Sequence, residues 1–121
     1  MQLIIKPRRT GKTTAIINQV LDLEVIGARA YVITQDMFSR NNFKKLLVKQ
    51  GCCADIVFSY QEFDRFDLLG IKIDYIFIDD IDRIEFGKLG SRSINYYSHK
   101  IIAYGTSIPK GLSRKLYENS G

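Results

Sequence analysis

Short apolar runs alternate with longer, more polar segments along this 121-residue chain, and this alternation restricts its fold more than any other feature. Apolar runs of roughly four to eight residues are typical of buried strands, and the longer segments carry apolar residues at helical spacing. Strands are predicted at residues 2–6, 30–34, 54–59, 73–80 and 100–107. Helices are predicted at residues 13–26 and 38–51, and residues 60–70 as a loop or short helix.

Strands that alternate with helices predict an α/β fold with a mainly parallel sheet and right-handed crossovers. The first run, residues 2–6, lacks the alternation of a half-exposed strand, so we expect it to be covered on both faces. Ligands of such sheets bind outside the carboxyl ends of the strands. We therefore expect the loops after Ile5, Ile78 and Ala103 to converge on a site.

The length and composition indicate one globular domain over residues 1–121, with disorder expected only in the last few residues. No apolar run approaches the length of a membrane span, and the opening residues lack the pattern of a secretory signal. The adjacent Cys52 and Cys53 cannot form a disulfide framework. These features predict a cytoplasmic protein without membrane attachment.

The net charge of +5 is unevenly distributed. Residues 1–50 carry nine Lys and Arg against three Asp and Glu, residues 51–90 carry four against nine, and the remainder carries five against one. Basic ends suit a polyphosphate or nucleic acid, and an acidic centre suits a metal ion. A solvated basic surface explains the charge alone equally well.

The segment "KPRRTGKTT" follows the first predicted strand and matches the phosphate-binding P-loop, G-x-x-x-x-G-K-[ST], except that Lys6 replaces the first glycine. Backbone N–H groups and the helix N-terminus of such a loop wrap the phosphates. Lys12 is expected to reach the β- and γ-phosphates, Thr13 to ligate Mg²⁺ and Thr14 to help hold the phosphates. The predicted nucleotide-binding residues are Pro7, Arg8, Arg9, Thr10, Gly11, Lys12, Thr13 and Thr14. A basic strand-to-helix turn is the simpler alternative.

A second motif, "YIFIDD", is an apolar strand that ends in two carboxylates about 65 residues after the loop. Asp79 is expected to hold Mg²⁺, usually through water, and Asp80 to orient the nucleophile that attacks the γ-phosphate. Arg8 is expected to add charge to the phosphates or to pair with the acidic turn. Asp80, Lys12 and Arg8 are thus the predicted catalytic residues, unless "DDID" is only an acidic turn after a buried strand.

Together these motifs resemble the ATPase domain of phage terminase large subunits, which pump DNA into capsids and belong to the helicase-like P-loop ATPases. "PRRTGKTT" is similar to the variant terminase P-loop, which commonly lacks the first glycine and has an arginine where Arg8 stands. "YIFIDD" is similar to the Walker B strand, and "IIAYGTSIPKGLSRKLYE" to the segment around the coupling motif. In that segment the matches are Ser107, Pro109, Gly111 and Tyr117, while Ile108 replaces a threonine.

The resemblance implies a three-layer α/β/α P-loop NTPase fold of the RecA/ASCE-like type, with about five strands. It also implies ATP and Mg²⁺ as cofactors and a coupling or sensor role for Thr106 and Ser107. Helicase-like relatives often contact the DNA backbone through loops after their second and third strands. The corresponding candidates are Arg40, Lys44, Lys45 and Lys49, for which a solvated helix face is the alternative.

The chain departs from the terminase pattern in three ways. Asp80 stands where the family has a catalytic glutamate, and its shorter side chain is expected to make hydrolysis slow. The chain begins at the P-loop strand, which leaves base selectivity open, and no nuclease domain or second motor lobe follows. We therefore expect either a reduced, single-domain relative or one module of a larger assembly, and a larger assembly or a homo-oligomer would supply an arginine in trans.

Hydrolysis that needs a further arginine would take it from a neighbouring subunit or partner. Arg83, Arg92 and Arg114 lie near the predicted ligand edge, where ordinary surface arginines are the simpler interpretation.

The sequence predicts an ATP-binding, slowly ATP-hydrolysing domain of the terminase or helicase type that acts with DNA. Two alternatives stay open. One is a small kinase similar to thymidine kinases, although the zinc-binding cysteine region of those enzymes is not visible here. The other is a P-loop module that has lost catalysis and binds or regulates a partner.

Overall fold

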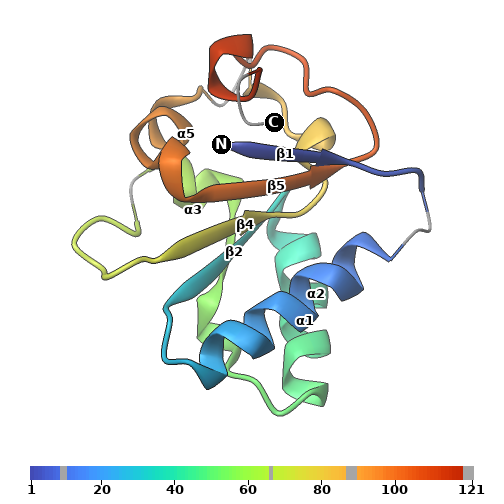
Figure 1. Cartoon of the computed structure of the whole chain (residues 1–121), viewed down its shortest axis with the longest axis vertical. Coiled ribbons are helices and arrows are strands. Elements are labelled where there is room, and N and C mark those ends of the chain that lie inside the picture. Colours follow the sequence, from blue (N-terminus) through green and yellow to red (C-terminus); the bar gives the residue numbers. More distant parts are fainter. Residues whose placement is uncertain (9–10, 66, 87–89, 119–121) are drawn as a thin grey trace.

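The computed structural model describes residues 1–8, 11–65, 67–86 and 90–118, and within them a parallel sheet lies between helices (Figure 1). The strands are β1 (Gln2–Ile5), β2 (Ala30–Thr34), β3 (Val57–Ser59), β4 (Tyr75–Ile78) and β5 (Ile101–Gly105). The helices are α1 (Lys12–Val25), α2 (Met37–Lys49), α3 (Tyr60–Asp64) and α5 (Arg92–Tyr97). Single 3₁₀ turns are η1 (Ala54–Ile56), η2 (Ile81–Arg83), η3 (Ser98–Lys100) and η4 (Arg114–Leu116). The predicted α/β fold is confirmed.

The strand order is β1-β5-β4-β2-β3, and every described pair is parallel. β5 therefore lies between β1 and β4, with Ile4 opposite Tyr104 and Ile78 opposite Ala103. Because parallel strands end at the same edge of the sheet, the segments after these three strands are neighbours at the carboxyl edge. The predicted convergence of the three loops is confirmed.

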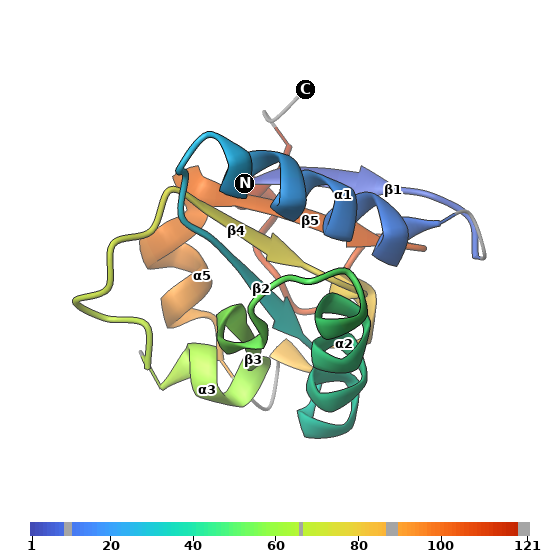
Figure 2. The same cartoon turned by 90° about the horizontal axis from the view of Figure 1, so that it is seen from below.

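Helices cover both faces of the sheet, α1 and α2 on one and α3 and α5 on the other (Figure 2). Alternate strand residues feed the two cores, because successive side chains of a strand point to opposite faces. In β4, Ile76 and Ile78 pack with the α3 and α5 residues, whereas Phe77 packs with the α1 and α2 residues. The chain is thus a three-layer α/β/α structure.

The starts of the helices follow from local capping. Asp36 caps α2, because its carboxylate accepts a hydrogen bond from the backbone N–H of Ser39 at 2.8 Å. α3 begins with a capping box, in which Ser59 and Glu62 bond to each other's backbone N–H groups. α1 starts differently, after Gly11 in the left-handed conformation and without a side-chain cap.

Three details differ from the sequence-based expectation. β1 lies at the edge of the sheet, where Leu3 and Ile4 are half-buried and Ile5 is 43% exposed, so it is covered on both faces only in part. The predicted strand at residues 54–59 begins with the turn η1, and only Val57–Ser59 pair with β2. Helix α5, buried through Ile94 and Tyr97, was not expected.

Among the described residues, no helix is both long enough and apolar enough to cross a membrane. Residues 119–121, for which the sequence predicts disorder, lie outside the described part of the chain.

Candidate functional site

A cavity of about 310 Å³ opens at the carboxyl edge of the sheet. Three segments that are distant in sequence line it: the loop between β1 and α1, the turn after β4 and the residue after β5. The lining residues are Arg8, Gly11, Lys12, Thr13, Thr14, Asp80, Arg83 and Thr106. The structure thus brings the P-loop-like segment, the predicted catalytic carboxylate and the predicted coupling residue to one cavity.

Gly11 makes the turn from the loop into α1. Its φ is 77° and a Cβ atom built on it would meet nothing within 4 Å, so glycine is favoured here by backbone conformation and not by space. The first turn of α1 contains no acidic residue and has no side-chain cap. The partial positive charge at this helix end is therefore not offset by the helix's own side chains, which suits an anionic ligand.

Lys12 is a buried cation at the first position of α1, only 8% exposed. Its Nζ atom donates a hydrogen bond to the carbonyl oxygen of Pro7 at 3.3 Å, so the ammonium group reaches back across the loop. Burial of a lysine whose described hydrogen bond goes to a neutral carbonyl is costly, which makes a bound anion beside Nζ favourable. Of the predicted loop residues, Arg9 and Thr10 lie outside the described residues.

Asp79 follows β4 directly and is 8% exposed. Its Oδ2 atom accepts a hydrogen bond from the Thr13 hydroxyl at 3.0 Å, and its buried Oδ1 atom has no hydrogen-bond partner among the described residues. Burial and the neighbouring charge of Asp80 raise the pKa of Asp79 to about 6, against the opposing effects of Thr13 and Lys12. The site therefore holds a desolvated carboxylate oxygen that a cation or water could satisfy.

Asp80 opens the turn η2 in the left-handed conformation, with φ 55°, and is the non-glycine residue with positive φ among those described. This conformation is uncommon outside glycine and costs about 1 kcal/mol or more. The backbone N–H of Arg83 bonds to the Asp80 carbonyl at 2.9 Å, and the next side chain, Ile81, is fully buried. The turn is thus anchored in the core while Asp80 faces the cavity.

Asp82 joins this turn to the segment after β5. It accepts hydrogen bonds from the backbone N–H of Thr106 at 2.9 Å and from the Thr106 hydroxyl at 2.8 Å. Burial works against ionisation of Asp82, but the two bonds from Thr106 outweigh it and lower the pKa of Asp82. This double hydrogen bond holds Thr106 at the wall of the cavity.

Gly105 makes the double hydrogen bond possible. A Cβ atom at this position would lie 2.6 Å from Asp82 Oδ1 and 3.1 Å from Ile81, so any side chain would displace the carboxylate. Sequence reasoning missed the roles of Asp82 and Gly105. The available signals were the third carboxylate of "DDID" and the glycine of "GTS".

Most of the other predicted residues do not line the cavity. Ser107 is exposed and does not line the cavity. Arg40 forms an ion pair with Glu62 at 3.3 Å, and its side chain is 20% exposed, so this candidate DNA contact is engaged within the protein. Lys45 and Lys49 are exposed and Lys44 is half-buried on α2. Of the three arginines noted near the ligand edge, Arg83 lines the cavity.

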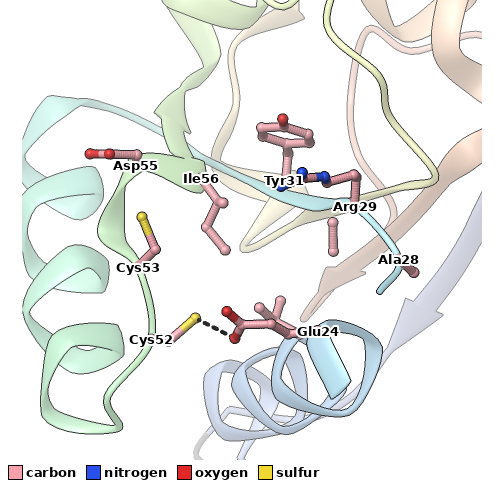
Figure 3. Close-up of a pocket in the computed structure, with 10 residues that line it drawn as sticks. Glu24, Ala28, Arg29, Tyr31, Cys52, Cys53, Asp55 and Ile56 are labelled. Carbon is pink, nitrogen blue, oxygen red and sulfur yellow. Dashed lines mark hydrogen bonds between the residues drawn. The ribbon is translucent and has the colours of Figure 1, made fainter. Parts of the chain in front are cut away.

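A second cavity, of about 250 Å³, lies at the opposite, amino edge of the sheet (Figure 3). There the Cys52 thiol donates a hydrogen bond to Glu24 Oε2 at 3.3 Å. Burial, with the Glu24 hydrogen bond and charge, raises the pKa of Cys52 to about 11, so the thiol stays protonated and unreactive at neutral pH. In the described part of the chain, no three His, Cys, Asp or Glu side chains gather to hold a metal.

No family model, curated protein or solved structure matches this chain. The case for a function therefore depends on the chain's own residues and geometry.

Proposed function

We propose that this chain binds ATP together with Mg²⁺ in the cavity at the carboxyl edge and hydrolyses it slowly. The observation that carries this proposal is the joint lining of one cavity by the P-loop-like segment, Asp80 and Thr106. The hydrogen bond from Thr13 to Asp79 supports it, because it links the loop to the strand end that would share the metal.

The charges around the cavity suit a polyphosphate. Lys12, Arg8 and Arg83 supply positive charge, and the uncapped N-terminus of α1 supplies backbone N–H groups. Phosphate oxygens accept hydrogen bonds from both kinds of donor, and these charge-assisted bonds are about twice as strong as neutral ones. The cavity volume of about 310 Å³ falls within the range of small-molecule sites.

The residues also fit Mg²⁺. This ion is usually held by one or two carboxylates, with phosphates and waters as the other ligands, so a dedicated cage of protein ligands is not required. Thr13 and the partnerless Oδ1 atom of Asp79 would hold it. When bound, the ion would neutralise charge that develops on the phosphate oxygens.

Asp80 is the proposed water-orienting residue. Asp80 lines the cavity, and its turn is fixed by the burial of Ile81 in the core and by the hydrogen bonds of Asp82 to Thr106. A carboxylate within reach of a water can accept its proton during attack on the terminal phosphate. Aspartate reaches less far than glutamate, and a displacement of about 1 Å can cost roughly 100-fold in rate, hence the proposed slow turnover.

The proposal extends to DNA through the likeness to terminase ATPase domains. Lys45 and Lys49 are exposed on α2 and available for phosphate contacts. A larger assembly or a homo-oligomer would then supply the arginine in trans. This extension is tested by measuring ATP hydrolysis with and without double-stranded DNA. If DNA leaves the rate unchanged, the DNA proposal is refuted and the proposal of an ATP site still holds.

The experiment for the ATP site compares the wild type with Lys12→Met and with Lys72→Met, an exposed lysine outside the cavity and the proposed DNA contacts that serves as the matched control. Nucleotide affinity and phosphate release are measured with Mg²⁺. We expect Lys12→Met to lower ATP affinity by about 100-fold and Lys72→Met to leave affinity and phosphate release unchanged. Wild-type protein that binds no ATP at millimolar concentration would refute the proposal, whereas tight binding without phosphate release would identify a catalytically inactive nucleotide-binding module.

A further inference from the structure

Arg83 lines the cavity, and neither the P-loop motif, the strand-end motif nor the coupling motif assigns it a role. We infer that Arg83 contacts the terminal phosphate of bound ATP and thereby makes the site prefer the triphosphate over the diphosphate. This inference rests on the proposed ATP site and adds a specificity-determining residue to it.

The geometry of η2 sets the direction of Arg83. A 3₁₀ turn has about three residues per turn, so neighbouring side chains diverge by about 120° and side chains three residues apart lie on the same side. Ile81 points into the core and Asp82 points to Thr106. Arg83 follows on the side of Asp80, and both residues line the same cavity.

The turn that carries Arg83 is held in place from several sides. The Arg83 N–H bonds to the Asp80 carbonyl at 2.9 Å, Ile81 is fully buried, and Asp82 makes two hydrogen bonds to Thr106. Because the backbone at Arg83 is already held by these contacts, little backbone entropy is lost when the side chain binds a ligand.

The Arg83 guanidinium also lacks a strong partner within the described protein. The ion pairs among the described residues are Arg40–Glu62 and Arg65–Asp67, and neither includes Arg83. Its charge does contribute to the lowered pKa of Asp82, which places it close to this turn. The side chain is exposed, so it can swing toward an anion in the cavity at small cost.

The position of η2 selects the terminal phosphate. A P-loop holds the α- and β-phosphates on its backbone N–H groups, on the side of β1 and α1. η2 follows β4, which lies two strands from β1 with β5 between them, a distance of about 10 Å at the usual strand spacing. Of the phosphates of a nucleotide held by the loop, the terminal phosphate of a triphosphate is therefore the one that extends farthest toward Asp80 and Arg83. Arginine suits this contact because its planar fork can bond two phosphate oxygens at once.

The test measures dissociation constants of MgATP and MgADP for the wild type, Arg83→Gln and Arg65→Gln by isothermal titration calorimetry. Arg65 is a matched control, since it is also exposed and its side chain pairs with Asp67 on the surface. We expect Arg83→Gln to weaken ATP binding by about tenfold or more and to change ADP binding by less than about twofold. Arg65→Gln is expected to change neither, and circular dichroism verifies that both variants are folded.

The outcomes separate the inference from the proposed function. If the wild type binds ATP and Arg83→Gln changes neither affinity, or weakens ATP and ADP binding equally, the role of Arg83 is overturned. The proposed ATP site is not affected by that result. A wild type that binds neither nucleotide overturns both. Selective loss of ATP affinity in Arg83→Gln alone establishes the role.

Discussion

The two cavities at opposite edges of the sheet are similar in volume, about 310 and 250 Å³, but they differ in how their polar groups are satisfied. At the amino edge the Cys52 thiol bonds to Glu24, and the carboxylate of the nearby Asp74 accepts a bond from the Arg29 N–H. At the carboxyl edge Asp79 keeps a buried oxygen without a hydrogen-bond partner among the described residues, and the hydrogen bond described for Lys12 goes to a neutral carbonyl, that of Pro7. Unsatisfied charge, and not volume, distinguishes a candidate site here.

The largest contrast is expected between Asp79→Asn and Glu24→Gln, the same chemical change at the two edges. Asp79→Asn should lower the proposed ATP hydrolysis by about 100-fold or more, because the proposed Mg²⁺ would lose its charged ligand. In metal-free buffer its free energy of unfolding should stay equal or rise, since a buried charge is removed. Glu24→Gln should leave hydrolysis unchanged. Phosphate release measures hydrolysis and urea denaturation measures stability. Equal hydrolysis rates in both variants would contradict the proposed difference between the two cavities.

A smaller contrast is expected between glycines at the two edges. Gly105→Ala should lower the free energy of unfolding by about 2 to 3 kcal/mol, because the new Cβ atom collides with Asp82. Gly27→Ala near the amino edge should cost about 1 kcal/mol, since its φ of 77° is unfavourable for alanine but its surroundings are open. Chemical denaturation measures both values. Equal costs would show that the close approach at Gly105 relaxes without loss.

Thr106→Val tests the hydrogen bonds between the segments after β4 and β5. Loss of the hydroxyl leaves Asp82 Oδ2 without this donor, so the unfolding free energy at pH 7 should fall by about 1 to 2 kcal/mol. The lowered pKa of Asp82 means that its bonds stabilise the fold above the ordinary aspartate pKa of about 3.8, and that this stabilisation is lost as the pH falls below it. The difference between wild type and Thr106→Val should therefore shrink at pH 3. Thr106→Ser should restore most of the stability, and a serine variant as weak as valine would argue against the hydrogen bond.

The smallest effect is expected in the alkylation of the two cysteines at the amino edge. In the wild type at pH 8, iodoacetamide should modify the exposed Cys53 and leave the buried Cys52 largely unmodified. Glu24→Gln removes the carboxylate that contributes to the raised pKa of Cys52, so modification of Cys52 should rise severalfold while burial still limits it. Tandem mass spectrometry of the peptide that contains both cysteines gives the rates. Unchanged modification of Cys52 would mean that burial alone protects it.

The local parts of the fold could be predicted from the sequence, and the arrangement of its strands could not. β2 and β5 are continuous apolar runs, and α1 carries Ile16, Ile17 and Val20 on one buried stripe. α5 is only six residues long, too short for a clear helical period. The edge position of β1 depends on which strand pairs with which, and local composition does not encode this.

In the candidate site, too, contiguous motifs could be predicted from the sequence and contacts between distant residues could not. Residues of the P-loop-like segment and of "YIFIDD" could be chosen because each motif is contiguous. The hydrogen bonds from Thr106 to Asp82 and from Arg40 to Glu62 join residues that are 24 and 22 positions apart in the sequence. No local sequence pattern predicts such bonds. For Arg83 the sequence favours an ordinary surface arginine. Whether its side chain reaches the cavity depends on the shape of the turn after β4, and the sequence does not reveal that shape.

The pairing of β1 with β5 also determines when the candidate site can form. Gln2 lies opposite Ile102, so β1 can pair with its described neighbour in the sheet only after all the segments between them have been synthesised. Contacts of such long sequence separation carry a large loop-closure cost and make folding slow. The helices and β2 to β4 can begin to assemble during synthesis, but the segment between β1 and α1 gains its fixed position only after β5 has entered the sheet. The P-loop-like segment, although it precedes β2 to β5 in the sequence, thus gains its final position late in folding.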